Sequence, residues 1–251
     1  MTAYRHKLHI DHSQAPIDYE LKVSARAKRI TLRVVPGRGL VVSVPSNFSK
    51  AGLAQFLESQ RQWIQSTLAA QEACVPERYR HWPPRELVLP AINTRLLLTY
   101  SDAAQLLPLS ESGEEIVRCN IQAPLNNKAV VAREISVQLK KLAKRSLPGL
   151  LASHAHLHGL SYKRVSIRGQ RTVWGSYSSS GTLSLNYKLL FLSRELLDYV
   201  LLHELAHTIH ADHSPAFWQL LCSLNVNARR LDKQLRNASI DLPPWLEASA
   251  S

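Results

Sequence analysis

Cysteine and methionine are scarce in this chain, and long apolar runs are missing from it. The three cysteines, Cys74, Cys119 and Cys222, lie far apart, and no two of them form a C-x-x-C pair. This spacing argues against a disulfide framework and a cysteine-based zinc site, and it favours reduced thiols. No apolar run is long enough to cross a bilayer, and the N-terminus lacks the apolar core of a secretory signal. We therefore expect a cytoplasmic protein with no membrane partner.

Positive charge is in excess, and it is unevenly distributed over the 251 residues. The formal net charge is +12, but the segment from His203 to the end holds four basic and five acidic residues. The first 202 residues therefore carry +13. A field of this sign attracts polyanions, so nucleic acid is a candidate partner of the basic surface. The alternative is a basic protein without such a partner, because the basic residues form no dense run.

The first half of the chain predicts a small mixed sheet with a helix. Alternating or β-branched residues predict strands at 19–23, 30–35 and 41–44, the last two forming a hairpin around Pro36-Gly37-Arg38-Gly39. Apolar positions after Ser49, spaced by three and four residues up to Leu68, predict one helix. The proline-rich stretch at 75–90 is expected to be a loop, and short strands are expected at 95–100 and 116–121.

A long helical region is expected next. Apolar positions from Val130 to Leu147 predict a first helix, and Pro148 suits the first turn of a second one that ends before Gly159. This region also holds His154, His156 and His158, which we interpret as surface or interhelix residues rather than metal ligands.

Strands and short helices are expected to complete the chain. Strands are predicted at 165–168, 173–178 and 182–186, the last two forming a hairpin. Ser193 is the expected N-cap of the next helix, Ser214-Pro215 begins another, and residues 228–235 form a final one. The whole pattern predicts an α+β protein with an N-terminal domain over residues 1–124 and a second domain over residues 125–251.

The segment His203-Glu204-Leu205-Ala206-His207 carries the chemistry. Residues four apart share one face of a helix, so His203 and His207 can bind one zinc ion. Glu204 would lie beside the metal and act as general base. The helix is apolar almost all round and therefore buried, and a buried Glu is costly unless a cation compensates it. The alternative is a pair of histidines packed in an ordinary helix.

A third ligand is expected from the chain after the helix. His213 lies six residues past His207, far enough for the chain to turn back, and three ligands would leave one tetrahedral position open, as in catalytic zinc sites. Asp212, His210 and a distant Glu stay open as alternatives, and Asp212 could instead orient an imidazole. The only methionine is Met1, and His210 stands where metzincins have glycine, so we exclude that class.

Three neutral imidazoles leave zinc electrophilic enough to activate water, with Glu204 moving the proton to the leaving amine of a peptide. An extended substrate could pair with a strand above the helix. The candidate substrate-binding residues are those of the last predicted strand: Thr182, Leu183, Ser184, Leu185 and Asn186.

Residues 168–218 resemble the YgjP-like metallopeptidase family, which is related to the SprT-like and WLM proteases. The resemblance rests on four segments: Val173-Trp174-Gly175-Ser176, Leu185-Asn186-Tyr187, Asp198-Tyr199-Val200 before the zinc motif, and His213-Ser214-Pro215-Ala216-Phe217-Trp218. The N-terminal part is also similar in Arg26-Ala27-Lys28-Arg29-Ile30, Val42-Ser43-Val44-Pro45 and Trp63-Ile64. Two positions depart from the family pattern, since Val173 replaces an Arg and Tyr177 a Cys.

The resemblance implies a compact zincin-like domain that binds one zinc ion through His203, His207 and His213, with Glu204 as base. It also implies a bacterial cytosolic setting, and SprT-type relatives act near DNA. Two rival functions remain. The same metal site could cleave a phosphoanhydride, as in a nucleotide pyrophosphatase, with Arg168 and Arg171 binding the phosphates. Alternatively, the metal is structural in a non-catalytic module that binds nucleic acid.

Overall fold

The computed structural model describes residues 4–8, 17–35, 39–73, 75–100, 108–111, 114–170, 173–236, 238 and 242–248. The chain divides into two compact units, one of residues 1–80 with Pro243–Ala248 and one made mainly of His81–Leu242. The boundary expected at residue 124 falls inside the second unit, in a loop that joins a strand to a long helix. No helix in the described part of the chain combines the length and apolar character that a membrane span requires.

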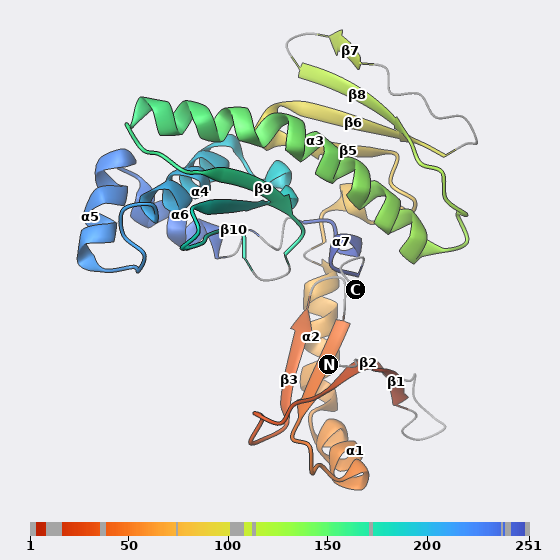
Figure 1. Ribbon diagram of the computed structural model, residues 1–251. Coiled ribbons are helices and arrows are strands. Elements are labelled where there is room, and N and C mark those ends of the chain that lie inside the picture. Colours follow the sequence, from red (N-terminus) through yellow and green to blue (C-terminus); the bar gives the residue numbers. More distant parts are fainter. Residues whose placement is uncertain are drawn as a thin grey trace. The chain divides into compact units, whose positions relative to one another are not determined.

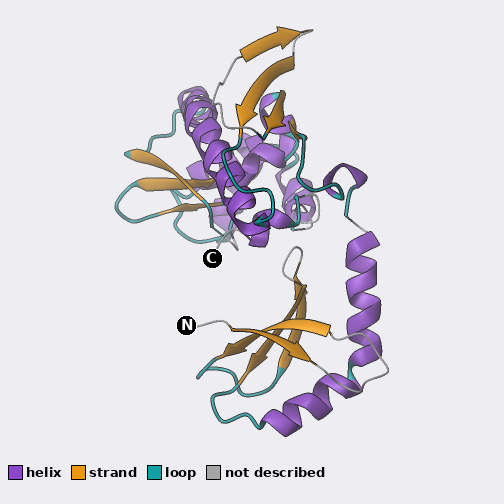
Figure 2. Ribbon diagram, turned by 90° about the vertical axis from the view of Figure 1, so that its right-hand side faces the viewer, coloured by secondary structure: helices purple, strands orange, loops and turns teal. Residues whose placement is uncertain are grey.

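In residues 1–80, the first unit contains a four-stranded sheet and two helices (Figures 1 and 2). The strands are β1 (Tyr4–Leu8), β2 (Ile17–Val23), β3 (Thr31–Val35) and β4 (Gly39–Val44), in the order β1-β2-β4-β3. The β3–β4 hairpin is confirmed as antiparallel, whereas β2 pairs with β4 in parallel. The core joins one face of the sheet to the helices through Leu21, Leu40, Val42, Val44, Leu53, Leu57 and Ile64.

The helical pattern that begins after Ser49 forms two helices rather than the single one expected. They are α1 (Lys50–Ser59) and α2 (Arg61–Ala73). Gln60 ends α1 because its backbone, with ψ near 5°, leaves the helical conformation, and its N–H donates to the carbonyls of Phe56 and Leu57. The buried positions continue across this break at a helical spacing, so the apolar pattern alone could not reveal it.

The second unit begins with a sheet in the order β5-β6-β8-β7. Its strands are β5 (Glu86–Leu89), β6 (Thr94–Thr99), β7 (Pro108–Glu111) and β8 (Glu114–Asn120). The two strands expected near 95–100 and 116–121 are confirmed, and they pair in parallel. The prediction of a loop over residues 75–90 is wrong for its last part, where Glu86–Leu89 form β5. Leu87 and Leu89 are fully buried, and their burial favours a strand despite the prolines around it.

One uninterrupted helix, α3 (Lys128–Leu157), runs along this unit (Figure 1), where two helices were expected. Pro148 lies inside it and removes one N–H from the helical hydrogen-bond pattern. Leu147 and Leu151 on either side are fully buried. Their packing outweighs the local cost of the proline, so the helix continues.

A second sheet and the remaining helices follow. The sheet has the order β10-β11-β9 and consists of β9 (Arg164–Arg168), β10 (Gly175–Tyr177) and β11 (Thr182–Asn186). The expected β10–β11 hairpin is confirmed. The helices are α4 (Arg194–Ala206), α5 (Pro215–Leu224), α6 (Ala228–Leu235) and α7 (Trp245–Ala248). Ser193 and Ser214 cap α4 and α5 as expected, each accepting a hydrogen bond from a first-turn N–H.

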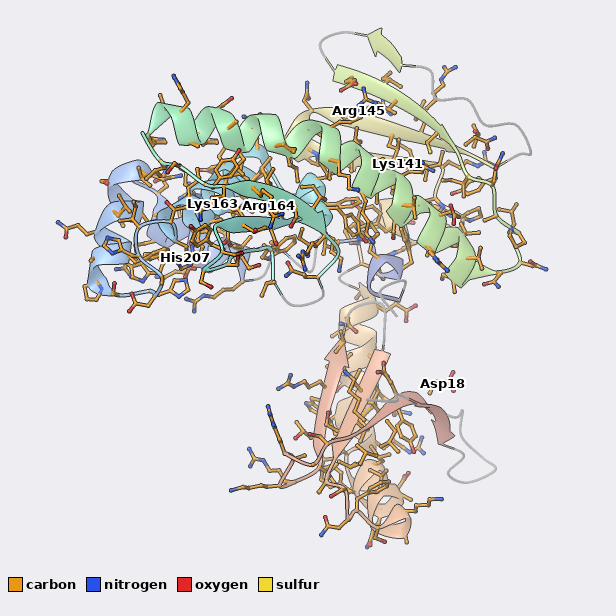
Figure 3. The ribbon with its side chains drawn as sticks, in the orientation of Figure 1. Asp18, Lys141, Arg145, Lys163, Arg164 and His207 are labelled. Carbon is orange, nitrogen blue, oxygen red and sulfur yellow. The ribbon has the colours of Figure 1, made fainter. Side chains whose placement is uncertain are left out.

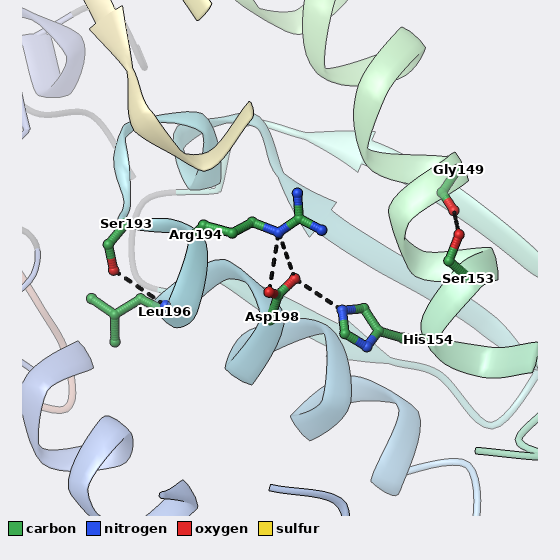
Figure 4. A network of polar contacts seen from close by, with 7 residues as sticks. All are labelled: Gly149, Ser153, His154, Ser193, Arg194, Leu196 and Asp198. Atoms are coloured by element: carbon green, nitrogen blue, oxygen red, sulfur yellow. Dashed lines mark hydrogen bonds and ion pairs between the residues drawn. The ribbon is translucent and has the colours of Figure 1, made fainter. Parts of the chain in front are cut away.

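Helices α3 and α4 are joined by a polar network of three side chains (Figure 4). His154 Nε2 lies 2.9 Å from Asp198 Oδ1, and Arg194 Nε donates to both oxygens of the same carboxylate. His154 is therefore an interhelix residue, as expected. Burial acts to raise the pKa of Asp198, but the hydrogen bonds from His154 and Arg194 outweigh it and lower that pKa below its ordinary value.

We predict that Asp198→Asn lowers the free energy of unfolding by about 2 kcal/mol at pH 7, the scale of hydrogen bonds to a charged group. A carboxylate whose folded-state pKa is depressed stabilises the fold above its ordinary pKa, 3.8, and loses that contribution as the pH falls through the folded-state value. The difference between wild type and variant should therefore stay constant from about pH 6 to about pH 4 and shrink as the pH falls towards about 2. Urea denaturation across this range measures it, and a difference that does not shrink would contradict the assignment.

Candidate metal centre

Three histidines converge at the end of α4. The ligand atoms of His203, His207 and His213 all lie within 4.8 Å of one another, and His203 Nε2 is 3.1 Å from His213 Nε2. His203 lies in the last turn of α4 and His207 is its C-cap, whereas His213 directly precedes Ser214, the N-cap of α5. The structure thus brings together the three residues that the sequence analysis selected.

The turn between the two helices explains how His213 reaches the site. After Ala206 the N–H groups of Ile209 and His210 both donate to the Ala206 carbonyl, which closes the helix end. Asp212 Oδ1 then accepts from the N–H of Ser214 at 3.3 Å and fixes the start of α5. Asp212 therefore shapes the turn. In the described structure its carboxylate forms no hydrogen bond with an imidazole, so the orienting role considered for it is not observed.

Both histidines of the helix have their Nδ1 atoms near a polar group. His207 Nδ1 lies 3.0 Å from the carbonyl of His210, which can only accept, so Nδ1 carries the proton and Nε2 keeps its lone pair. His203 Nδ1 lies 3.4 Å from the hydroxyl of Tyr199, one helical turn earlier. Of His210, only the backbone takes part in these contacts.

An aromatic ring supports the three imidazoles. The centroid of Phe217, in the first turn of α5, lies 5.1 Å from that of His203, 4.6 Å from that of His207 and 4.9 Å from that of His213. Phe217 is fully buried. One buried ring therefore contacts all three histidines.

The two histidines of the helix end, His203 and His207, are neutral at neutral pH, which is the form that binds a metal. Burial first, and then the neighbouring His207 and His213, lower the pKa of His203 to about 4. Burial also lowers the pKa of His207. Nitrogens bound to tetrahedral zinc at about 2.0–2.1 Å lie about 3.3 Å apart, close to the 3.1 Å between His203 and His213. The donor set, and the separation of this pair, therefore fit a zinc ion.

Glu204 directly follows His203 in α4 and is buried. Its side chain is only 5% exposed, and Oε2 has no hydrogen-bond partner among the described residues. Burial raises its pKa to about 8. A buried carboxyl group without partners is costly, and a nearby cation would favour its charged form. This unpartnered carboxyl is a second observation that fits a metal ion at the histidines.

The carboxyl group of Glu204 occupies space that a side chain at position 175 would need. A Cβ at Gly175 would lie 2.5 Å from Glu204 Oε1 and 2.7 Å from Cδ. Strand β10 can therefore pass so close to α4 only because residue 175 has no side chain. Sequence analysis missed this role, although an isolated glycine in a strand signals a close approach of the backbone.

Strand β11, where the substrate-binding residues were expected, is the middle strand of its sheet. It pairs with β10 on one side and β9 on the other. Leu183 and Leu185 are fully buried, Ser184 contacts Ser166, and both hydrogens of the Asn186 amide go to the carbonyls of Gln170 and Val173. An extended substrate could not pair with β11, because both of its edges are already taken.

Strand β10 is the edge strand that lies next to α4. In the described part of the chain it pairs only with β11, and its Gly175 contacts Glu204. Among the two departures from the family pattern, Val173 is 42% exposed just before β10, and Tyr177 ends the strand. Arg168, considered for phosphate binding, is exposed on β9, and Arg171 lies outside the described residues.

Comparison with known families defines the class of the protein. Residues 28–238 match the model of the YgjP-like family, metallopeptidase domain. The matched segment includes the three histidines and Glu204, and it defines the chain as a metallopeptidase. The chain belongs to the YgjP-like metallopeptidase family, as its resemblance indicated. A search of curated proteins finds no match.

Two solved structures, both of metallopeptidase zymogens, are similar to part of the chain. The zymogen of Pyrococcus abyssi abylysin is 26% identical and covers 36% of this chain and 91% of its own, with a TM-score of 0.33. The zymogen of Methanocaldococcus jannaschii jannalysin is 19% identical and covers 37% of this chain and 95% of its own, also with a TM-score of 0.33.

We predict that Gly175→Ala lowers peptide turnover by about 100-fold, because the new Cβ displaces the Glu204 carboxyl by the order of an ångström. Metal content, measured by atomic absorption, should stay unchanged. Gly149→Ala is the matched control, since nothing lies within 4 Å of a Cβ in that place on α3 and alanine favours a helix. Equal turnover in both variants would show that the carboxyl has room to move.

Proposed function

We propose that this protein is a zinc-dependent peptidase in which Glu204 is the general base. The observation that carries this proposal is a buried carboxyl group, with no hydrogen-bond partner for Oε2 among the described residues, next to three imidazoles whose ligand atoms lie within 4.8 Å of one another. A purely structural zinc site needs no such carboxyl group, and it would use all four coordination positions.

The roles of the residues follow from their surroundings. His203, His207 and His213 would hold the ion, and Phe217 would keep their rings in place. A zinc ion bound there would supply Lewis acidity and lower the pKa of a water molecule to around neutrality. Glu204 would then accept a proton from water and deliver it to the leaving amine. The cation's charge would also lower the pKa of Glu204 from the value that burial gives it.

A peptide substrate would add to the sheet at β10 rather than at β11. No strand of the described segments pairs with β10 on the side away from β11, and an extended chain that paired there would lie next to Glu204. The residues first considered, Thr182–Asn186, would then support this edge strand from the inside of the sheet.

The basic surface is a candidate contact for nucleic acid. Figure 3 labels Lys141 and Arg145 on α3 and Lys163 and Arg164 at the start of β9. All four are exposed, and none forms an ion pair with another residue of the described segments. Cations that are not neutralised by the protein can bind phosphates. Such a contact would recruit the protein to its substrate and would leave the chemistry at the metal centre unchanged.

We predict that Glu204→Gln keeps the zinc and lowers peptide hydrolysis by about 10²–10⁴-fold, the usual contribution of a general base. Purified protein should be assayed on casein peptides and on nucleoside triphosphates side by side. Glu195→Gln, which removes an exposed carboxylate in the first turn of the same helix, is the control and should keep wild-type turnover. Hydrolysis of the triphosphates alone would favour the pyrophosphatase instead.

We predict that His213→Ala weakens zinc binding by more than about 100-fold, which exceeds the usual effect of losing an outer contact. The matched control is His210→Ala, because only the backbone carbonyl of His210 contacts the site and alanine retains it. Competition with a chromogenic chelator measures both affinities. Unchanged affinity in His213→Ala, or a loss in His210→Ala, would contradict the ligand assignment.

A further inference from the structure

Tyr199 is a fully buried residue of α4 that lies between a proposed zinc ligand and a carboxylate of another helix. Its hydroxyl is 3.4 Å from His203 Nδ1 and 3.3 Å from Asp232 Oδ1 on α6. The other oxygen of Asp232 accepts from Arg236 at 2.7 Å. A chain of polar contacts thus leads from His203 through Tyr199 to α6.

The carboxylate of Asp232 determines which group donates in each of these hydrogen bonds. Asp232 can only accept, so the single proton of the Tyr199 hydroxyl points towards it. The hydroxyl oxygen is then left as an acceptor, and the Nδ1 atom of His203 must donate to it. A histidine with its proton on Nδ1 has its free lone pair on Nε2, which is the atom that faces His213.

We propose that Tyr199 and Asp232 are positioning residues, which fix the tautomer and ring orientation of His203 for metal binding. This inference rests on the proposed zinc site. It makes α6 a functional part of that site, although none of the proposed ligands lies on α6. Residues that orient a ligating histidine commonly change metal affinity by 10–100-fold when they are removed.

A second contact between the same two helices serves as a reference. Glu195 in the first turn of α4 forms an ion pair with Arg230 of α6. This pair also joins α4 to α6, but it touches none of the three histidines. A variant at this position therefore reports the cost of loosening α6 without any effect on the tautomer of His203.

The experiment compares zinc affinities by chelator competition in wild type, Tyr199→Phe, Asp232→Ala and Glu195→Gln. Phenylalanine fills the volume of the buried tyrosine and removes only the hydroxyl, whereas Asp232→Ala frees the hydroxyl proton to turn towards His203. We expect zinc binding to weaken 10–100-fold in both of these variants and to change less than twofold in Glu195→Gln. Asp232→Asn, which keeps an acceptor oxygen, should recover part of the affinity.

The visible absorption of the cobalt-substituted proteins gives a readout that a loss of stability alone would not alter. The absorption should shift in Tyr199→Phe and Asp232→Ala and stay unchanged in Glu195→Gln, because only the first two change the hydrogen bond that orients His203. Wild-type affinity and spectrum in Tyr199→Phe would overturn the positioning role. Failure of the wild-type protein to bind zinc would overturn the proposed function, and this inference with it.

Discussion

The arrangement of the metal centre depends on one costly feature, the burial of the Glu204 carboxyl group without a hydrogen-bond partner for Oε2 in the described structure. In an apolar helix such a group is tolerated only where its charge is neutralised or balanced. The histidines of the same helix and of the following turn provide the place for a balancing cation. Gly175 provides the space for the carboxyl, and Glu204 could not act as the proposed base if either condition failed.

The fold meets these conditions because α4 ends at the histidines and the chain then turns back towards them. Helix α4 ends at His207, so its last turn presents His203, and the short turn to α5 returns His213 to the same point. The polar groups of this turn are used to shape it, as the contact of Asp212 with Ser214 shows. Phe217 then packs against the rings. The histidines are therefore held together by their short separation along the chain and by this aromatic packing.

The local parts of this site could be predicted from the sequence, because the spacing of His203 and His207 and the caps Ser193 and Ser214 act within a few residues. The parts that depend on pairing between distant segments could not. Strand β11 was expected to bind substrate, but its alternating sequence does not reveal that both edges are paired. Pro148 likewise signals a helix start, and only the packing of the residues around it shows that the helix continues.

The two proposed ligands at the end of α4, His203 and His207, differ in what orients their rings. The Nδ1 atom of His207 donates to a carbonyl three residues along the chain, so its orientation forms together with the helix end. The Nδ1 atom of His203 depends on Tyr199, whose own direction is fixed by Asp232, 33 residues further on. Formation of α4 alone would therefore orient one imidazole and leave the other free to adopt either tautomer. The proposed metal centre would therefore require α6 to be packed in place, which would couple metal binding to the folding of the C-terminal helices.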